Sequence, residues 1–313
     1  MTVHRVPDVH HRLWTTRHTP TLEISDGDVL EFSAPEAAGG QFDDFRPGDP
    51  VPALKPELLY PMLGPVMVDG AEPGDTLELE LLDFTPEGWG WTAVLPGMGL
   101  LPEDFPDPHL HRWEFPAEGD GTATADFLDV ARVPVRPFLG VLACAPDTDE
   151  PLDVMPPGPF GGNIDCRDLV AGTRVFLPVQ TPGGRLTLAD PHAAQGDGEV
   201  CVSAIEAPLD GRLRVTLHRG RSIPTPQFRT PGPLRPGIED AGFYATMGIG
   251  PDVRLAARDA VRYMVDHISS TYRLDPLDAY VLASVVVDLK ISEAVDEPHW
   301  VVSAYLPLSV MNA

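Results

Sequence analysis

The chain has 313 residues, enough for one large domain or two of ordinary size, and its formal net charge at pH 7 is −25. So acidic a surface repels phosphate groups, which argues against nucleic acid as a partner. The sequence contains no apolar run of about 18 residues, so neither a membrane span nor a membrane partner is expected.

The N-terminus and the cysteines predict a cytoplasmic location. The first residues lack the basic start and the apolar stretch of a secretory signal. Cys144, Cys166 and Cys201 are odd in number and show no CxxC spacing, so neither a disulfide framework nor a zinc ribbon is indicated.

The first two-thirds of the chain predict β-strands joined by turns. Residues 21–25 and 29–32 alternate polar and apolar side chains and enclose an Asp-Gly turn signal. A similar unit recurs at residues 66–83 and repeats the pattern Gly-Asp-x-Leu-Glu. One hairpin type used twice is the favoured explanation, and an internal duplication is the alternative. Further strands are predicted at residues 133–141, 174–180, 185–189, 200–207 and 212–217.

The spacing of apolar residues changes near residue 250. Apolar positions at helical spacing predict a helix over residues 251–270, and Asp275 followed by Pro276 predicts the cap and first turn of a second helix that runs to residue 289. Residues 301–308 then predict a closing strand, while the Pro- and Gly-rich segments 34–52 and 221–236 predict long loops.

These elements predict a mainly β (α+β) protein, with strands arranged as a β-sandwich or barrel and two helices near the C-terminus. A strict β-α-β alternation is missing, which argues against a doubly wound parallel sheet. We expect a single unit over residues 1–313, with two intertwined β-rich subdomains, about 1–145 and 146–313, as the alternative division.

The densest polar cluster is the segment Asp190-Pro-His192-Ala-Ala-Gln195-Gly-Asp197-Gly-Glu199. In an extended chain, residues two apart point to the same face, so these carboxylates and the imidazole could project together around a Gly-rich bend. Converging carboxylate and imidazole groups are what a divalent metal site needs. The alternative is a solvated loop between strands, in which Asp, Gln and Gly are common.

A second cluster, Gly161-Gly162-Asn163-Ile164-Asp165, again places two polar residues two positions apart after a double glycine. By itself it also fits an ordinary turn. Cys166 follows directly, and it is interpreted either as a nucleophile or as a small buried thiol, the second being the usual case.

Absent motifs narrow the chemistry. The sequence has no Gly-x-Ser-x-Gly elbow, no His-Glu-x-x-His and no P-loop. Its two lysines, Lys55 and Lys290, lie near neither a cysteine nor a Ser/Gly-rich tract, so amide hydrolysis by a Ser-Ser-Lys or a Glu-Lys-Cys triad is disfavoured. Metal-activated water is the better candidate if the chain cleaves amides.

Several segments, in order along the chain, resemble the blocks of the acetamidase/formamidase family. The signature Gly64-Pro-Val-Met-Val-Asp-Gly-Ala-Glu-Pro-Gly-Asp75 is accompanied by the two polar clusters described above, except that Ala189 replaces the family's leading glycine. Further matching blocks are residues 96–101, 136–141, 282–291 and 295–298. The resemblance implies a cytoplasmic, homo-oligomeric, metal-associated hydrolase that splits a short-chain amide of the formamide or acetamide type into ammonia and a carboxylate. Residues 34–41 and 58–63 depart from the family pattern, which puts the substrate in question.

We therefore expect an amide hydrolase with a divalent metal, zinc rather than calcium, held by Asp165, Asp190 and His192. Such a metal lowers the pKa of bound water from ~15.7 toward about 7. The alternative is a non-catalytic binding protein of the same fold, in which the same carboxylates hold a calcium ion that only fixes a loop.

The catalytic roles divide among the remaining polar residues of the two clusters. Asn163 or Gln195 would donate a hydrogen bond to the developing oxyanion. Glu199 would act as general base or as a further metal ligand, and Glu199 or Asp197 would protonate the leaving amine.

Overall fold

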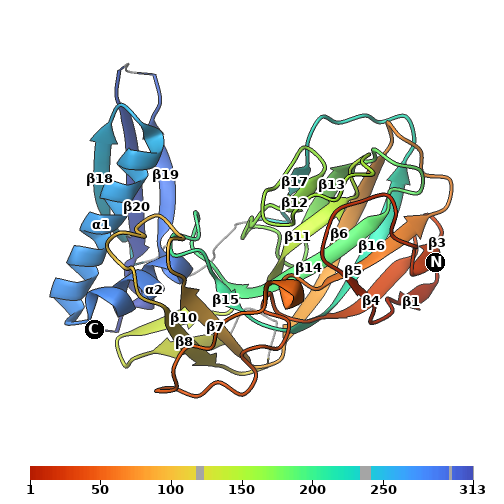
Figure 1. Cartoon of the computed structure of the whole chain (residues 1–313). Helices are drawn as coiled ribbons and strands as arrows, with labels where there is room; N and C mark the ends of the chain where they lie inside the picture. The colour runs from red at the N-terminus through yellow and green to blue at the C-terminus, as the bar shows by residue number, and fades with distance from the viewer. Residues whose placement is uncertain (118–122, 233–240, 296–297, 313) are drawn as a thin grey trace.

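The computed structural model describes residues 1–117, 123–232, 241–295 and 298–312, arranged as two lobes (Figure 1). The predicted loop 221–236 and the block 295–298 therefore lie partly outside the described residues. The described chain is mainly β, with two α-helices that lie close to the C-terminus, which confirms the predicted fold class. Neither helix is long and apolar enough to cross a membrane.

The larger lobe is a sandwich of a six-stranded and a nine-stranded sheet. The six-stranded sheet has the order β1 (Val3–Arg5), β4 (Val29–Ala34), β16 (Leu209–His218), β6 (Thr76–Pro86), β13 (Arg174–Pro178) and β17 (Gln227–Arg229). The nine-stranded sheet has the order β12 (Gly161–Asn163), β11 (Phe138–Cys144), β14 (Leu186–Ala194), β15 (Ile205–Glu206), β7 (Trp89–Val94) and β8 (His109–Glu114). It also includes β5 (Met62–Val68), which pairs with β14, β2 (His10–His11) and β3 (Leu22–Ile24).

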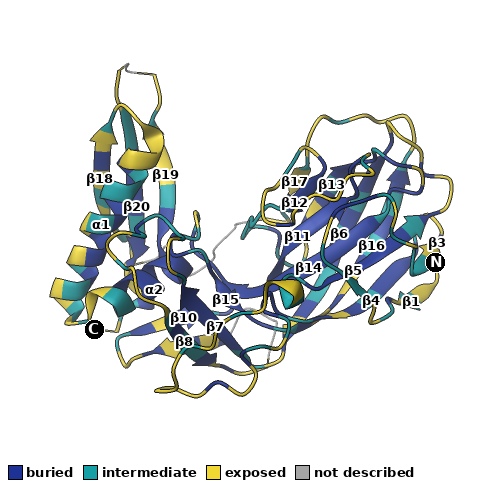
Figure 2. Cartoon of the chain, in the orientation of Figure 1, coloured by how far each residue is buried: buried dark blue, intermediate teal, exposed yellow. Residues whose placement is uncertain are grey.

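An apolar core fills the space between these two sheets. Leucine and valine side chains from β4, β6 and β16 meet those from β5, β11 and β14, and most are completely buried. Figure 2 shows the strands of this lobe buried over much of their length, with exposed residues gathered on the loops. The interior is therefore apolar on the side of β14 that faces the six-stranded sheet.

The smaller lobe packs helices on a three-stranded sheet of β18 (Phe243–Gly250), β20 (Trp300–Pro307) and β19 (Asp288–Glu293). Its second core is shared with β7, β8, β9 (Thr124–Phe127) and β10 (Ala131–Pro134), so the two lobes are continuous. Short 3-10 helices η1 (Pro56–Leu58) and η2 (Leu308–Val310) complete the fold.

Helix α2 begins where the sequence predicts, and helix α1 begins two residues after the predicted start at residue 251. Helix α1 (Val253–Tyr272) is capped by Asp252, whose carboxylate accepts the Leu255 N–H at 2.9 Å. Helix α2 (Pro276–Val286) starts with Pro276 after the Asp275 cap. The predicted end at residue 289 is wrong, because Asp288 already begins β19, which pairs with β20. Strand pairing at this point overrides the apolar pattern that suggested a longer helix.

The two Asp-Gly and Gly-Asp turns do not close hairpins, which corrects the favoured explanation of the repeat. Strands β3 and β5 lie side by side in the nine-stranded sheet, while β4 and β6 flank β16 in the other sheet. Each turn therefore carries the chain from one sheet to the other. Asp28 and Asp75 have the same role, because each carboxylate accepts the N–H of the residue three positions earlier.

Other strand predictions are right in place and wrong in extent. Residues 133–141 split into β10 and β11, which Pro137 separates because it has no N–H for a sheet. In residues 200–207 only β15 is a strand, because the preceding chain turns at Glu199 and Val202, both with positive φ. The strands additional to the prediction are β1, β2, β7, β8, β9, β12, β17, β18 and β19, and β17 lies within the predicted loop 221–236.

Candidate active site

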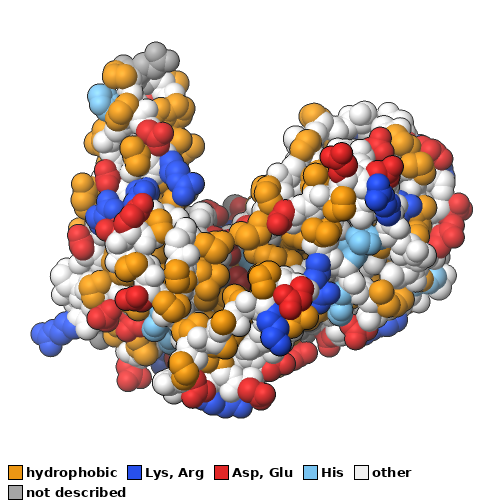
Figure 3. Space-filling view, in the orientation of Figure 1, with side chains coloured by type: hydrophobic (Ala, Val, Ile, Leu, Met, Phe, Trp, Pro, Cys, Tyr) orange, Lys and Arg blue, Asp and Glu red, His pale blue; other side chains and the backbone are white. Residues whose placement is uncertain are grey.

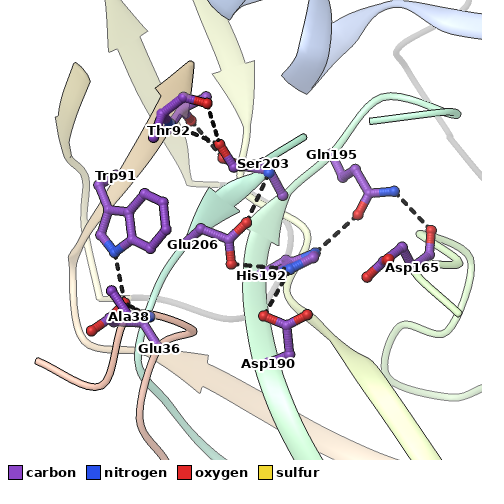
Figure 4. Close-up of polar contacts among 12 residues, drawn as sticks. Glu36, Ala38, Trp91, Thr92, Asp165, Asp190, His192, Gln195, Ser203 and Glu206 are labelled. Carbon is purple, nitrogen blue, oxygen red and sulfur yellow. Dashed lines mark hydrogen bonds and ion pairs between the residues drawn. The ribbon is translucent and has the colours of Figure 1, made fainter. Parts of the chain in front are cut away.

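The site is built on the central strand β14, which carries Asp190 and His192. Both side chains are buried, with 4% and 1% of the residue surface exposed. Strand β15 pairs with β14 so that Glu206 lies opposite His192, and Glu206 is also buried. Two carboxylates therefore flank one imidazole inside the nine-stranded sheet (Figure 4).

Hydrogen bonds orient the His192 ring. Its Nδ1 lies 2.9 Å from Oε1 of Gln195, and the Gln195 amide nitrogen donates to the Asp165 carbonyl at 2.7 Å. Since Oε1 is an acceptor, the proton is on Nδ1 and Nε2 points to the carboxylates. The Nε2 atom lies 3.3 Å from Asp190 Oδ1 and 3.1 Å from Glu206 Oε2.

A set of buried polar atoms in the site has no hydrogen-bond partner among the described residues. These atoms are Asn163 Oδ1, Asp165 Oδ1, Asp190 Oδ1, His192 Nε2 and Glu206 Oε2. Buried polar groups normally have partners, because an unpaired one costs about 1–3 kcal/mol. Because these atoms belong to one site, they indicate that the site binds a ligand.

The spacing of these atoms fits a bound cation. Two ligands about 2.1 Å from one ion lie roughly 3.0–3.4 Å apart at ordinary coordination angles, and the 3.1 and 3.3 Å separations around Nε2 agree. Asp190, His192 and Glu206 form one candidate group, and Asp165, His192 and Glu199 form another that shares the histidine. Every ligand atom of a group lies within 4.8 Å of the others.

Gly140 on β11 makes room for this arrangement. A Cβ at position 140 would lie 2.7 Å from Asp165 Oδ1, 2.9 Å from Asp190 Oδ2 and 3.1 Å from the His192 ring. Two of these distances are shorter than real Cβ contacts, so any side chain here would enter the space between the polar groups. The glycine is needed for the close approach of three functional side chains.

The backbone at the site is unusual as well. Asp165, Asp190 and Glu199 have φ values of 42°, 57° and 43°, in the left-handed region that costs residues with a Cβ free energy. Tyr60, with φ 48°, adds a fourth among the nine such non-glycine residues of the described chain. Such conformations persist where a structure holds them for a purpose, typically at functional sites.

Burial and mutual repulsion disfavour the charged carboxylates. Burial and Asp190 raise the pKa of Asp165 to about 7, and burial raises the pKa of Glu206 to about 7 against the opposing effect of His192. Burial and Asp165 raise the pKa of Glu199 well above its ordinary value. Burial lowers the pKa of His192, but Glu206 and Asp190 outweigh it and hold that pKa well above the usual range. The cluster is thus built to take up positive charge, as protons or as a metal ion.

The structure separates the sequence-predicted residues into two groups. Asp165, Asp190, His192 and Glu199 come together as expected. Asp197 does not join them, because its carboxylate is 45% exposed and lies 3.8 Å from Arg167. The sequence argument that Asp197 and Glu199 project together assumed an extended chain, whereas this segment is a turn with Gly198 at φ 100°.

The two predicted oxyanion donors also differ. Both ends of the Gln195 amide are used within the protein, by His192 and by the Asp165 carbonyl, so Gln195 orients other site residues. Asn163 on β12 has an unpartnered side-chain oxygen in the site region. Cys166 follows Asp165, but burial raises the pKa of its thiol, which leaves it a poor nucleophile.

Sequence reasoning missed Glu206, which belongs to one of the two candidate ligand groups. Glu206 is the one charged residue in the mostly apolar segment Val200–Ala207. A single carboxylate in a predicted buried strand was the signal that could have identified it. Tyr60 was also missed, although it lies in the segment 58–63 noted as divergent.

Comparisons with known proteins agree with this picture. A formamidase of Methylophilus methylotrophus is 24% identical over 374 residues, which cover 96% of this chain and 89% of that protein. An acetamidase of Mycolicibacterium smegmatis is 26% identical and covers 61% of each chain. Among solved structures, an acetamidase from Bacillus halodurans is 28% identical, with a TM-score of 0.68 and 97% coverage of both chains. A γ-lactamase from Delftia acidovorans, 24% identical with a TM-score of 0.87 over 98% of this chain and 90% of its own, shares the fold.

By class, the protein is therefore an amide hydrolase, an enzyme that acts on carbon–nitrogen bonds. The model of the acetamidase/formamidase family matches residues 2–153 and 148–313, and the chain belongs to this family. The resemblance found in the sequence is confirmed.

Proposed function

We propose that this enzyme hydrolyses a short-chain aliphatic amide of the formamide or acetamide type and releases ammonia and the carboxylate. The relatives named formamidase and acetamidase support this substrate class. The observation that carries the proposal is the convergence of buried acceptor atoms without a hydrogen bond, from Asp165, Asp190, His192 and Glu206.

The proposal includes a divalent metal, zinc rather than calcium. One imidazole nitrogen with several carboxylate oxygens is a donor set that zinc accepts, whereas calcium prefers oxygen alone. Asp190, His192 and Glu206 would hold it, with Asp165 on the adjoining side. When bound, such an ion supplies activated water at neutral pH.

The protein's own residues supply orientation and proton transfer. Gln195 fixes the tautomer and the orientation of His192, a role typical of residues behind a metal-binding histidine. Burial and Asp165 raise the pKa of Glu199, which suits a group that takes a proton from water and returns it to the leaving ammonia. Asn163, whose side-chain oxygen is buried without a hydrogen bond, would help to orient the amide.

The test combines two measurements on purified protein. Ammonia release is followed with formamide, acetamide and a γ-lactam, and bound metal is counted by elemental analysis before and after chelation. Release from formamide or acetamide that is lost on chelation and restored by zinc supports the proposal. Full activity in a metal-free protein would exclude the metal, and cleavage of the lactam alone would exclude the substrate class.

Two further expectations stay predictions. A homo-oligomeric state and a cytoplasmic location both follow from the family resemblance and the composition. Sedimentation analysis tests the first, and cell fractionation tests the second.

A further inference from the structure

The described site is rich in hydrogen-bond acceptors and poor in donors. Four carboxylates, from Asp165, Asp190, Glu199 and Glu206, surround one imidazole whose Nδ1–H is already used by Gln195. An amide offers N–H groups that carboxylates accept, but its carbonyl oxygen needs a donor. Gln195 cannot serve, because its amide nitrogen donates to the Asp165 carbonyl.

Tyr60 is a side chain placed to fill this need. Strands β5 and β14 are antiparallel and pair at Leu63 and Leu188, so the chain just before β5 runs beside the residues just after Leu188, where Asp190 lies. Tyr60 is two residues before β5, immediately after the turn η1, which is drawn in orange in Figure 1.

The packing around Tyr60 agrees with this position. Its ring contacts the cluster that contains Val141 and Ala189, which are the neighbours in sequence of Gly140 and Asp190. It also contacts the cluster that contains Trp91, the residue paired with Glu206. The ring therefore lies between the two halves of the site, and it is only partly buried.

The backbone holds Tyr60 in this place at a cost. Its φ of 48° puts a bulky aromatic residue in the left-handed region, a conformation that is unfavourable for a residue with a Cβ. Its N–H donates to the Ala37 carbonyl at 2.8 Å, which ties it to the loop after β4. Burial, followed by Asp190 and then Glu206, raises the pKa of Tyr60, so the phenol keeps its proton at every working pH.

We propose that Tyr60 is a catalytic residue of this enzyme, whose phenol O–H donates a hydrogen bond to the carbonyl oxygen of the bound amide. As water adds to the carbonyl carbon, negative charge develops on that oxygen, and the hydrogen bond strengthens. The proton stays on Tyr60 throughout, because Glu199 carries the proton transfer. This inference rests on the proposed amide hydrolysis.

Figure 3 shows the surface between the two lobes. Hydrophobic side chains gather in the hollow between the two lobes, on the face of the molecule where β14 and β15 lie in Figure 1. A small neutral amide suits such an approach better than a charged molecule does.

The test compares Tyr60→Phe with wild type, both loaded with zinc, on formamide and acetamide. The variant keeps the ring and removes only the donor, so kcat should fall about 10²-fold or more while KM changes little. Tyr263→Phe is the matched control, because Tyr263 is 50% exposed on α1 and should leave both constants unchanged. Circular dichroism and zinc content verify that the variants are folded and loaded.

Calorimetric binding of acetate, the product of acetamide hydrolysis, provides a readout that needs no turnover. Acetate presents a carbonyl-type oxygen to the same donor, so its affinity should fall in Tyr60→Phe and stay constant in Tyr263→Phe. Unchanged kcat in Tyr60→Phe, or unchanged acetate affinity, would overturn the role of Tyr60. A wild type that hydrolyses none of the amides would instead refute the proposed function, and acetate binding would still decide whether Tyr60 contacts such an oxygen.

Discussion

Two carboxylate-rich regions of this molecule are built in opposite ways. On the six-stranded sheet, Glu78 lies 3.1 Å from Arg174 and 2.7 Å from His218, and Asp83 lies 2.7 Å from Arg212. These are cross-strand pairs on an accessible face, each acid with a cationic partner. In the nine-stranded sheet, Asp190 and Glu206 share one histidine and include oxygen atoms without a hydrogen bond.

This difference distinguishes carboxylates that have a structural role from those that have a functional role in a strongly acidic protein. A paired surface carboxylate has its charge balanced within the fold and contributes little to stability. A buried group with several acids and one imidazole has more negative charge than the fold balances, so it retains affinity for a proton or a metal ion.

The largest effect is expected for His192→Ala. Metal and activity should be lost together while the protein stays folded, because His192 is the histidine shared by both candidate ligand groups. His218→Ala, which removes the histidine beside Glu78, is the matched control and should retain both. Elemental analysis and ammonia release decide, and a His192→Ala enzyme with full metal content and wild-type turnover would refute the assignment.

Glu199→Gln should lower turnover by about 10²–10⁴-fold while metal stays bound, because the amide keeps the shape but cannot exchange a proton. If Glu199 is instead a ligand, the same variant loses metal and added zinc restores part of the rate. Measuring turnover and metal occupancy on one sample separates these roles. An unaffected enzyme would exclude both.

Gln195→Ala should weaken metal affinity by about 10–100-fold, because His192 loses the acceptor that orients its ring. Competition with a chelator of known affinity measures the change. Gln195→Glu retains an acceptor for Nδ1–H and should restore much of the affinity. Equal affinity in Gln195→Ala and wild type would show that the sheet alone orients His192.

The pH dependence of stability should differ between metal-free and metal-loaded protein. The folded-state pKa values of Asp165 and Glu206, both about 7, lie above the ordinary unfolded values near 4. A raised folded pKa stabilises the protein below about pH 4, and this stabilisation is lost as the pH rises through about 7. The metal-free protein should therefore lose stability, on the order of a few kcal/mol, from pH 4 to 8.

Bound metal should remove most of this loss, because it balances the ionised carboxylates. Denaturant unfolding at several pH values, with chelator and with zinc, tests the difference. Parallel curves for the two forms would contradict the proposed charge balance.

The smallest effect is expected for Arg174→Ala on the six-stranded sheet. Removing this half-exposed partner of Glu78 should cost less than about 1 kcal/mol of stability and leave turnover unchanged. Thermal unfolding and ammonia release measure both. A large loss of activity would mean that the surface pairs are coupled to the site, and the contrast between the two regions would fail.

Local signals in the sequence predicted a good part of the fold and of the site. Asp275-Pro276 marked the start of α2 because capping and the proline ring act within a few residues. Period-two alternation located strands such as β16, since one face of a strand meets the core. The short spacing of Asp190 and His192 placed them together because both lie on one strand.

Contacts between distant segments could not be predicted in the same way. The Asp-Gly and Gly-Asp turns suggested hairpins because turn chemistry is local, whereas the choice of partner strand depends on the whole sandwich. Asp197 was grouped with Glu199 because their spacing fits a strand, but a glycine turn directs its carboxylate toward Arg167. The division into subdomains stays a prediction.

The sequence by itself determined the family, the mainly β class, the two late helices and four of the acidic or imidazole groups of the site, since these depend on local patterns and ordered blocks. Only the tertiary structure brought Glu206 opposite His192, Tyr60 beside Asp190, and Gly140 beneath three functional side chains. Strand register joins residues far apart in the chain, and no local pattern encodes register. The balance of charge at the site is therefore a property of the folded sheet.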